Sequence, residues 1–245
     1  MTKIEEISNG IVRKSIKMKS IFALAFLAVG ISGTFIPERR LPIGFSDERI
    51  ITNQIEKAIE DAAQAIKDAG LDPFHIKKET SSYALPVPVL FNYEAFLEDL
   101  LSTGLSNIKT HRVNYSVITS RLTLDIELPL IHFSTGAAKA SGVVFSNDLE
   151  VSASGKIDIV SIRVEVVVRV SIGVISGISI RSIDVNFRLG DINSDVNLTV
   201  RGRDYSDVVN DFVGNFVPDT IKAHNKEINE LLEIVLKDVI EANLP

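Results

Sequence analysis

The 245-residue sequence contains no cysteine. Without a thiolate the chain cannot form a disulfide framework, a thiolate zinc site, an iron–sulfur cluster or a cysteine nucleophile. This absence does not assign the protein to the cytosol, because a secreted domain of about 200 residues can be stabilised by its core alone. Tryptophan is also absent and methionine occurs only twice, while valine and isoleucine dominate the middle of the chain, which favours a sheet there.

The sequence also lacks the motifs that usually carry catalysis. No GxSxG, GxGxxG or phosphate-loop pattern occurs, and the glycines at 173 and 177 have the wrong spacing for a nucleophile elbow. The four histidines are not in metal-ligand spacing, so we predict no metal site, no cofactor and no enzymatic activity; they are His75, His111, His132 and His224. His132 is expected to be a hydrogen-bonded histidine at the end of a sheet, and His224 a partly buried core histidine or a pH-dependent latch. A dispersed Ser–His–Asp set, as an esterase would need, stays open as an alternative.

Blocks of basic residues are missing as well. The net charge is −6, and the first 33 residues contribute five basic and two acidic side chains, a local +3, which leaves −9 for the remainder. An acidic surface repels phosphate backbones and anionic headgroups. We therefore expect no nucleic-acid partner and a neutral ligand.

The N-terminus has the pattern of a secretory signal peptide. The uncharged run 21–31 follows Lys17 and Lys19, is too short to span a bilayer comfortably, and is succeeded by small residues. We predict a signal peptide over residues 1–33 with cleavage near 30–34, a mature domain over 34–245, and secretion to the extracellular space without stable membrane insertion. Met18 is an alternative start that would give a compact basic segment before the run.

Two glycosylation sequons agree with export. They begin at Asn114 and Asn197, and each predicts a surface position if a glycan is attached.

Helical periodicity appears near the start of the mature chain. Apolar residues recur every three or four positions from Ile51 to Ile66, Ser46 is the expected N-cap and Gly70 the stop. The segment 71–74 then predicts a turn, and the stretch to Phe91 an irregular or edge-like segment. A short helix over about 93–102 is also predicted from helical spacing, with Gly104 following it.

From about residue 105 to 201 the apolar period changes to two, which indicates strands. The clearest run alternates valine and isoleucine from Val160 to Ile172 with polar residues between them. A phase slip at Arg181-Ser182 predicts a bulge, and Gly190-Asp191 predicts a turn. Runs of 9–13 residues are long for strands and predict a curved antiparallel sheet.

The C-terminal segment 205–242 carries two apolar stripes separated by Pro218, which predicts one long bent helix or a helix restart. Its expected length matches that of the strands. One elongated α+β unit follows, with the long curved sheet wrapped around this helix and the first helix also packed on apolar surface.

In this order of elements the chain resembles the arthropod tubular lipid-binding proteins, which include group 7 mite allergens, takeout and juvenile hormone-binding proteins. The resemblance is carried by the helix 51–69, Leu71-Asp72-Pro73-Phe74, Gly104-Leu105-Ser106-Asn107 and the closing helix. It implies a rolled sheet around a long helix with an elongated apolar cavity for a lipid or hormone. The lack of a cysteine pair near the mature N-terminus favours the mite-allergen-like branch over hormone binding.

Together these patterns predict a secreted carrier or scavenger of a small hydrophobic ligand, of lipid, fatty acid or terpenoid hormone type. The alternative is an innate-immune protein that recognises bacterial lipid or lipopeptide at one end of the rod, through exposed apolar loops. About half of the inward aliphatic side chains are expected to be plain core. The candidate ligand-binding residues are Leu122, Leu124, Ile126, Leu128, Val164, Val166, Val168, Phe212, Phe216, Leu231 and Val235.

Overall fold

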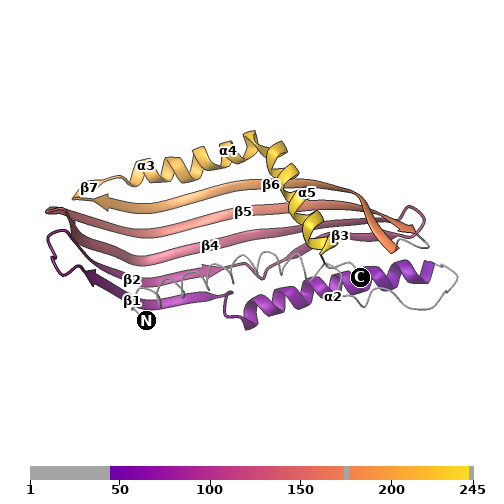
Figure 1. The fold of residues 1–245 in the computed structure, drawn as a ribbon, viewed down its shortest axis with the longest axis horizontal. Coiled ribbons are helices and arrows are strands. Elements are labelled where there is room, and N and C mark those ends of the chain that lie inside the picture. Colours follow the sequence, from indigo (N-terminus) through magenta and orange to yellow (C-terminus); the bar gives the residue numbers. More distant parts are fainter. Residues whose placement is uncertain (1–44, 174–176, 243–245) are drawn as a thin grey trace.

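A computed structural model describes residues 45–173 and 177–242, and it confirms the α+β class with a curled antiparallel sheet and a C-terminal helical segment (Figure 1). The sheet has seven strands in the order β1-β2-β4-β5-β6-β7, and β3 pairs with β4. Strands β1 and β7 do not pair with each other, so the curl stays open. The elements are α2 (Phe45–Asp68), β1 (Phe74–Ala84), β2 (Phe91–Thr103), β3 (Lys109–Ser116), β4 (Arg121–Val144), β5 (Asn147–Gly173), β6 (Gly177–Val200), β7 (Arg203–Asp204), α3 (Ser206–Asp211), η1 (Phe212–Phe216), α4 (Val217–Ala223) and α5 (Asn225–Glu241).

The three central strands run almost the whole length of the molecule. β4, β5 and β6 contain 24, 27 and 24 residues, well beyond the alternating runs from which they were predicted. The prediction of a turn at Gly190-Asp191 is wrong. Both residues lie within β6, and Asp191 pairs with Val160 of β5. Gly190 is needed there for a close approach: a Cβ would lie 2.7 Å from the Val160 carbonyl oxygen. The predicted bulge is confirmed, since Arg169 pairs with Ser182 and Val170 with Ile180, which leaves Arg181 without an opposite residue.

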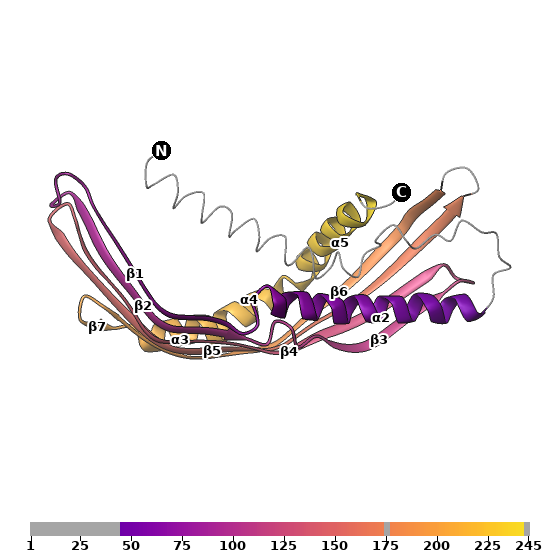
Figure 2. The same cartoon turned by 90° about the horizontal axis from the view of Figure 1, so that it is seen from below.

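The sheet is divided along β4 into two halves. β3 pairs with residues 121–127 of β4, and β2 pairs with residues 132–144 along the same edge. The sheet is bent along its length so that both ends rise toward one side, and α2 and α5 lie on that side (Figure 2). Both helices cover the half that contains β3, whereas, among the described residues, α3 and η1 lie beside the β6 edge of the half that contains β1 and β2 (Figures 1 and 2).

Helix α2 forms because its apolar residues share one face. Ile55 and Ile59 are each 3% exposed and pack on Leu124 of β4. The helix starts at Phe45, so Ser46 lies in its first turn and is not the N-cap. It ends as predicted at Gly70, whose φ of +67° allows its N–H to reach the carbonyl of Lys67 while the N–H of Leu71 reaches Ile66.

The helix predicted over 93–102 is wrong, because this segment is the central part of β2. It is bonded on one side to β1, a regular edge strand, and on the other to β4, so its backbone groups are satisfied by pairing. Asp99 has a φ of +49° and, like Leu100, is not paired with a residue of β4, although the register is the same on both sides of this gap. The apolar residues of this segment, at positions 93, 96, 97, 100 and 101, do not alternate, so their spacing looks helical.

Asp72 joins the two turns that precede β1 and β3. Its Oδ1 accepts the N–H of Gly104 (2.9 Å), and its Oδ2 accepts both the N–H of Ser106 (2.6 Å) and the Ser106 hydroxyl (2.5 Å). Burial raises the pKa of the Asp72 carboxyl, but these hydrogen bonds outweigh it and hold that pKa below its ordinary value of 3.8. The ends of α2 and β2 are thereby fixed to one another.

The C-terminal segment is a chain of helices and not one bent helix. Pro218 is fully buried in the first turn of α4, as expected of a helix restart, and a second interruption occurs at His224, between α4 and α5. The prediction that His224 is partly buried is wrong: its side chain is exposed, with Nδ1 2.9 Å from the Thr220 carbonyl oxygen. Its position at the helix break turns it away from the apolar line formed by Ile221 and Ile228.

Candidate functional site: an apolar groove at the end of the sheet

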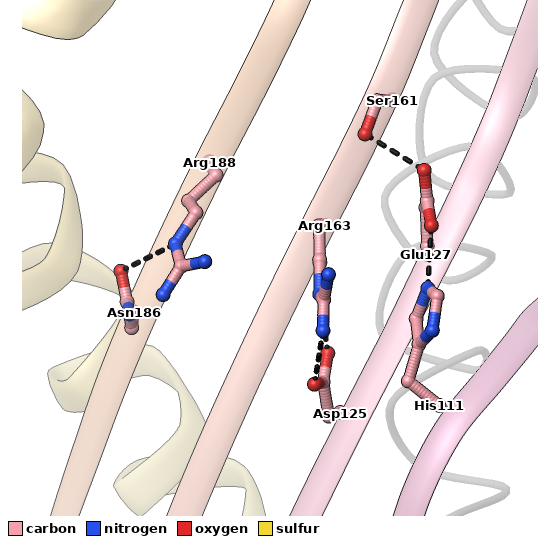
Figure 3. Close-up of polar contacts among 7 residues, drawn as sticks. All are labelled: His111, Asp125, Glu127, Ser161, Arg163, Asn186 and Arg188. Carbon is pink, nitrogen blue, oxygen red and sulfur yellow. Dashed lines mark hydrogen bonds and ion pairs between the residues drawn. The ribbon is translucent and has the colours of Figure 1, made fainter.

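Polar side chains of β3, β4, β5 and β6 form hydrogen bonds and ion pairs with one another on one face of the sheet (Figure 3). The Asp125 carboxylate accepts Nε and Nη2 of Arg163 at 2.8 and 2.6 Å, and Glu127 contacts His111 Nε2 (2.5 Å) and the Ser161 hydroxyl (2.7 Å). The hydrogen bonds from Arg163 hold the pKa of Asp125 below its ordinary value. These residues are the polar members of the alternation seen in the sequence, so the apolar members face the helices.

The apolar face of the β3–β6 half is mostly filled by helix side chains. Val166 pairs with both Leu124 and Val185, and this row packs against Leu236 of α5 and Ile59 of α2. Seven of the predicted wall residues lie in this face. Four of them are buried, namely Leu124, Val164, Val166 and Val168, and three are partly buried, namely Leu122, Ile126 and Leu128.

The other four predicted wall residues are exposed and lie on the C-terminal helices. Phe212 and Phe216 are 52% and 59% exposed, and their rings stack with centroids 5.3 Å apart. Leu231 and Val235 project from the side of α5 that does not contact the sheet, since Leu232, Leu236 and Ile240 make the contacts with it. The structure therefore divides the predicted set between packed core and exposed helix surface.

An open apolar groove of about 360 Å³ lies where β6 ends and the helices begin. Phe212 is the only predicted wall residue that lines it. The other lining residues come from the end of β6 and from the start of the helical segment: Leu198, Val200, Tyr205, Val208 and Val209. No charged side chain contributes to this lining, so the groove is suited to a neutral apolar ligand.

Helix α3 is held beside β6 by polar side chains that replace a neighbouring strand. The amide of Asn210 accepts the N–H of Val196 and donates to the carbonyl of the same residue, both at 2.9 Å. The Ser206 hydroxyl accepts the N–H of Leu198 (3.0 Å), and Asp204 accepts both the N–H and the hydroxyl of Ser206. The apolar residues between the anchors Ser206 and Asn210, which are Val208 and Val209, are thereby held beside the end of β6.

The helix widens into the π-helical turn η1 directly beside the groove. Gly214 lies against β6, where a Cβ would be only 3.4 Å from the carbonyl oxygen of Ile192. The wider turn keeps both phenyl rings, of Phe212 and Phe216, on the exposed side. Single π-helical turns are frequent at functional sites, which agrees with a binding role for this segment.

The remaining predicted sites are placed as follows. Asn114 in β3 and Asn197 in β6 are both exposed, so the surface position is confirmed and attachment of a glycan stays a prediction. His132 Nδ1 lies 2.5 Å from Asp158, which confirms a satisfied histidine, although within β4 and not at its end. Within residues 45–173 and 177–242, no group of three or more acidic or histidine side chains is placed to hold a metal, and no helix has the length and hydropathy to cross a membrane.

Residues 21–244 match the sequence profile of the haemolymph juvenile hormone binding protein family. The chain belongs to this family. The membership confirms the resemblance drawn from the order of elements, and it supports a lipid- or hormone-binding carrier in general terms. The juvenile hormone binding protein match extends through both turns that Asp72 joins and through the closing helices. The narrower expectation of a mite-allergen-like branch is not tested by this match.

Solved structures give weaker likenesses. The crystal structure of Epiphyas postvittana Takeout 1 is 14% identical over 80% of this chain and 89% of that chain, with a TM-score of 0.33. That of a lipopolysaccharide binding protein is 9% identical over 78% of this chain and 36% of that one, with a TM-score of 0.27. No match to a curated protein sequence was found.

Proposed function

We propose that this protein is a secreted carrier that binds a small hydrophobic ligand, of lipid, fatty acid or terpenoid type, in the apolar groove between the end of β6 and α3–η1. The groove is the observation that carries the proposal, because its lining is apolar and its volume is within the range of small-molecule sites. Membership of the juvenile hormone binding protein family supports it.

The energetic basis is the burial of exposed apolar surface. Val208 is 66% exposed and Phe212 is 52% exposed, so large parts of both side chains are accessible to water. A ligand that covers them gains about 25 cal/mol for each Å² of apolar surface removed from water, on itself and on the groove, before the cost of association. The groove holds the apolar part of the ligand, because its lining provides no partner for an anion, so the carboxylate of a fatty acid would remain in water at the open side. The chain performs no chemistry on this ligand.

Displacement of a fluorescent fatty-acid probe tests the proposal. The variant Val208→Glu places a charge in the groove at an exposed position, so folding is retained while probe affinity falls by at least about tenfold. The matched control is Ile234→Glu, which alters a 60% exposed side chain on α5 outside the groove lining. Equal probe binding by both variants, or no binding by the unmodified protein, contradicts the proposal.

Secretion and the single-domain organisation are part of the same proposal. The signal peptide over residues 1–33 lies outside the described residues, as does the start of the proposed domain 34–245. N-terminal sequencing of protein recovered from the medium of a eukaryotic host tests both, with a first residue near 31–35 as the expected result. Protein retained in the cell with residue 1 or 18 at its N-terminus contradicts the proposed export.

The alternative of bacterial lipid recognition is favoured by one observation. It requires exposed apolar loops at one end of the rod, and the loops at the far end of the sheet from the β3–β4 turn, residues 85–90 and 145–146, do carry large exposed apolar side chains. The acidic charge weighs against an anionic headgroup. Specific, saturable binding of lipopolysaccharide that persists in Val208→Glu would favour this function over the carrier.

A further inference from the structure

Two loops form an exposed apolar tip at one end of the sheet. The β1–β2 loop and the β4–β5 turn meet there, beyond the last strand pairs (Figure 1). We define the apolar tip by six side chains that are between 38% and 73% exposed: Val87, Val89, Leu90, Val144, Phe145 and Leu149. Isolated exposed apolar residues are common, but a contiguous group of this kind marks an interaction surface.

The tip has two properties that suit a lipid surface. First, no charged residue occurs in 81–93 or in 140–147, so these two segments can enter an apolar interface without desolvating an ion, whereas Leu149 lies between Asp148 and Glu150 and stays at the polar boundary. Second, much of the backbone at the tip is hydrogen-bonded internally, as the N–H of Phe145 donates to Leu90 (3.0 Å) and that of Ser146 donates to Val89 (2.8 Å). Asn147 and Asn92 donate their side-chain amides to further tip carbonyls, those of Phe145 and Pro88. Satisfied backbone groups are what a nonpolar solvent requires.

The tip is also continuous with the apolar groove. Val151 of β5 pairs with Val200, which lines the groove. Leu149 is two residues from Val151, so it projects from the same face at about 7 Å along the strand. An apolar path therefore leads from the tip to the groove without crossing a charged side chain of that face of β5.

We propose that the apolar tip docks the protein on a neutral lipid bilayer and that ligand passes along this face between the bilayer and the groove. Docking follows from the tip alone, whereas ligand passage rests on the proposed function. A specific protein interface commonly surrounds its apolar centre with polar and charged side chains, and no charged residue occurs in 81–93 or 140–147, so we take a bilayer as the occupant. An anionic bilayer gains nothing over a zwitterionic one, because the chain is acidic.

Because the sequence has no tryptophan, a single introduced indole reports the environment of the tip directly. Phe145→Trp is expected to shift its emission to the blue with phosphatidylcholine vesicles and to be quenched by brominated acyl chains. The control Ile118→Trp places the indole at an 82% exposed position in the β3–β4 turn, at the opposite end of the sheet, where no shift or quenching is expected. Equal quenching at both positions, or none at 145, overturns the proposal.

Vesicle flotation measures the docking itself. Phe145→Glu and Val89→Glu are expected to weaken binding to phosphatidylcholine vesicles at least about tenfold, while Ile118→Glu matches the unmodified protein. High salt is expected to leave binding unchanged. Binding that needs anionic lipid and is lost in salt, or a tip-dependent dimer in place of vesicle binding, overturns the proposal.

The carrier function and the bilayer docking can be refuted independently of each other. Probe binding in vesicle-free solution depends on the groove, so Val208→Glu loses the probe and keeps vesicle binding, whereas Phe145→Glu keeps the probe and loses vesicle binding. A protein that floats with vesicles but binds no probe retains the docking surface and refutes the carrier function. A protein that binds the probe but never floats retains the carrier function and refutes the docking surface.

Discussion

Replacement of Asp72 by asparagine tests how much this carboxylate stabilises the fold by joining the turns before β1 and β3. The side chain accepts three hydrogen bonds, from Gly104 and Ser106, and Ser106 is 6% exposed. Asparagine turns its NH₂ group toward at least one of these donors, which loses that bond and leaves the donor unsatisfied. Hydrogen bonds to a charged acceptor contribute about 1.5–3 kcal/mol each, so the expected loss is about 2–4 kcal/mol in the free energy of unfolding.

Chemical denaturation followed by circular dichroism measures this loss, and thermal unfolding gives a matching fall in Tm of roughly 4–16 °C for a domain of this size. Asp195→Asn is the control. Asp195 is 75% exposed at its side chain and lies 4.0 Å from Lys156, so its removal costs less than about 1 kcal/mol.

The pH dependence supplies the decisive comparison. The pKa of Asp72 is lower in the folded state than its ordinary value of 3.8, so its contribution is fully present above that value. As the pH falls through the folded pKa the contribution disappears, and the difference between the unmodified protein and Asp72→Asn shrinks. A difference that stays constant from pH 7 to pH 3 would refute the electrostatic explanation, and an effect no larger than that of Asp195→Asn would refute the structural role.

Three further changes have contrasting expected outcomes in the same denaturation assay. Leu236→Ala removes a buried side chain of α5 and is expected to cost about 2–5 kcal/mol, whereas Leu231→Ala on the exposed side stays within about 0.5 kcal/mol; equal costs would contradict the packing. Asn229→Ala removes the acceptor of a β6 N–H and is expected to cost about 1–3 kcal/mol, while an unchanged midpoint would show that water replaces it. Arg163→Met leaves Asp125 without its cation and is expected to lower the free energy of unfolding at pH 7, and this loss should shrink as the pH falls below 3.8 through the lowered folded pKa of Asp125; a loss independent of pH would refute this.

The sequence was sufficient for the elements whose period is uninterrupted. The apolar period of α2 and the alternation of β5 gave the correct structure and the correct buried face, since Ile59 and Val166 are both in the core. The bulge at Arg181 was visible for the same reason, as a slip in an otherwise regular pattern. Burial of one face of a helix or strand produces a periodic pattern of apolar residues in the sequence. That pattern can be recognised without knowing which element packs against the face.

Two elements were missed because long-range pairing decided them. In β2 the apolar residues do not follow a period of two, and only the pairing with the flanking strands β1 and β4 reveals that the segment is extended. At Gly190, the glycine accommodates a close approach to Val160 within a continuous strand, which sequence cannot distinguish from a turn. Strand lengths were underestimated for this reason, because each local break was taken as an end.

Of the residues that line the groove, only Phe212 was among the predicted ligand-binding residues. Val208 and Val209 belong to an apolar stripe of the C-terminal segment, but this pattern does not indicate whether other residues of the chain cover the stripe. Its partners Leu198 and Val200 belong to a second alternating run of β6, residues 196–200, which is out of phase with the run that contains Val185. The π-helical turn leaves no periodic signal, so the exposure of the phenyl rings could not be foreseen.

The exposure of these apolar residues follows from how the C-terminal helices protect β6. An open strand edge exposes unpaired N–H and C=O groups and invites association with other chains. Here side chains spaced four residues apart on the helices satisfy those groups, and they are Ser206 and Asn210 on α3, and Asn225, Asn229 and Glu233 on α5. Because part of the polar surface of each helix is directed at the sheet edge, apolar side chains such as Val208 and Leu231 remain in contact with water. The arrangement that closes the sheet edge therefore leaves the apolar surface that a ligand can cover, and a variant that weakens the edge contacts should alter ligand affinity together with stability.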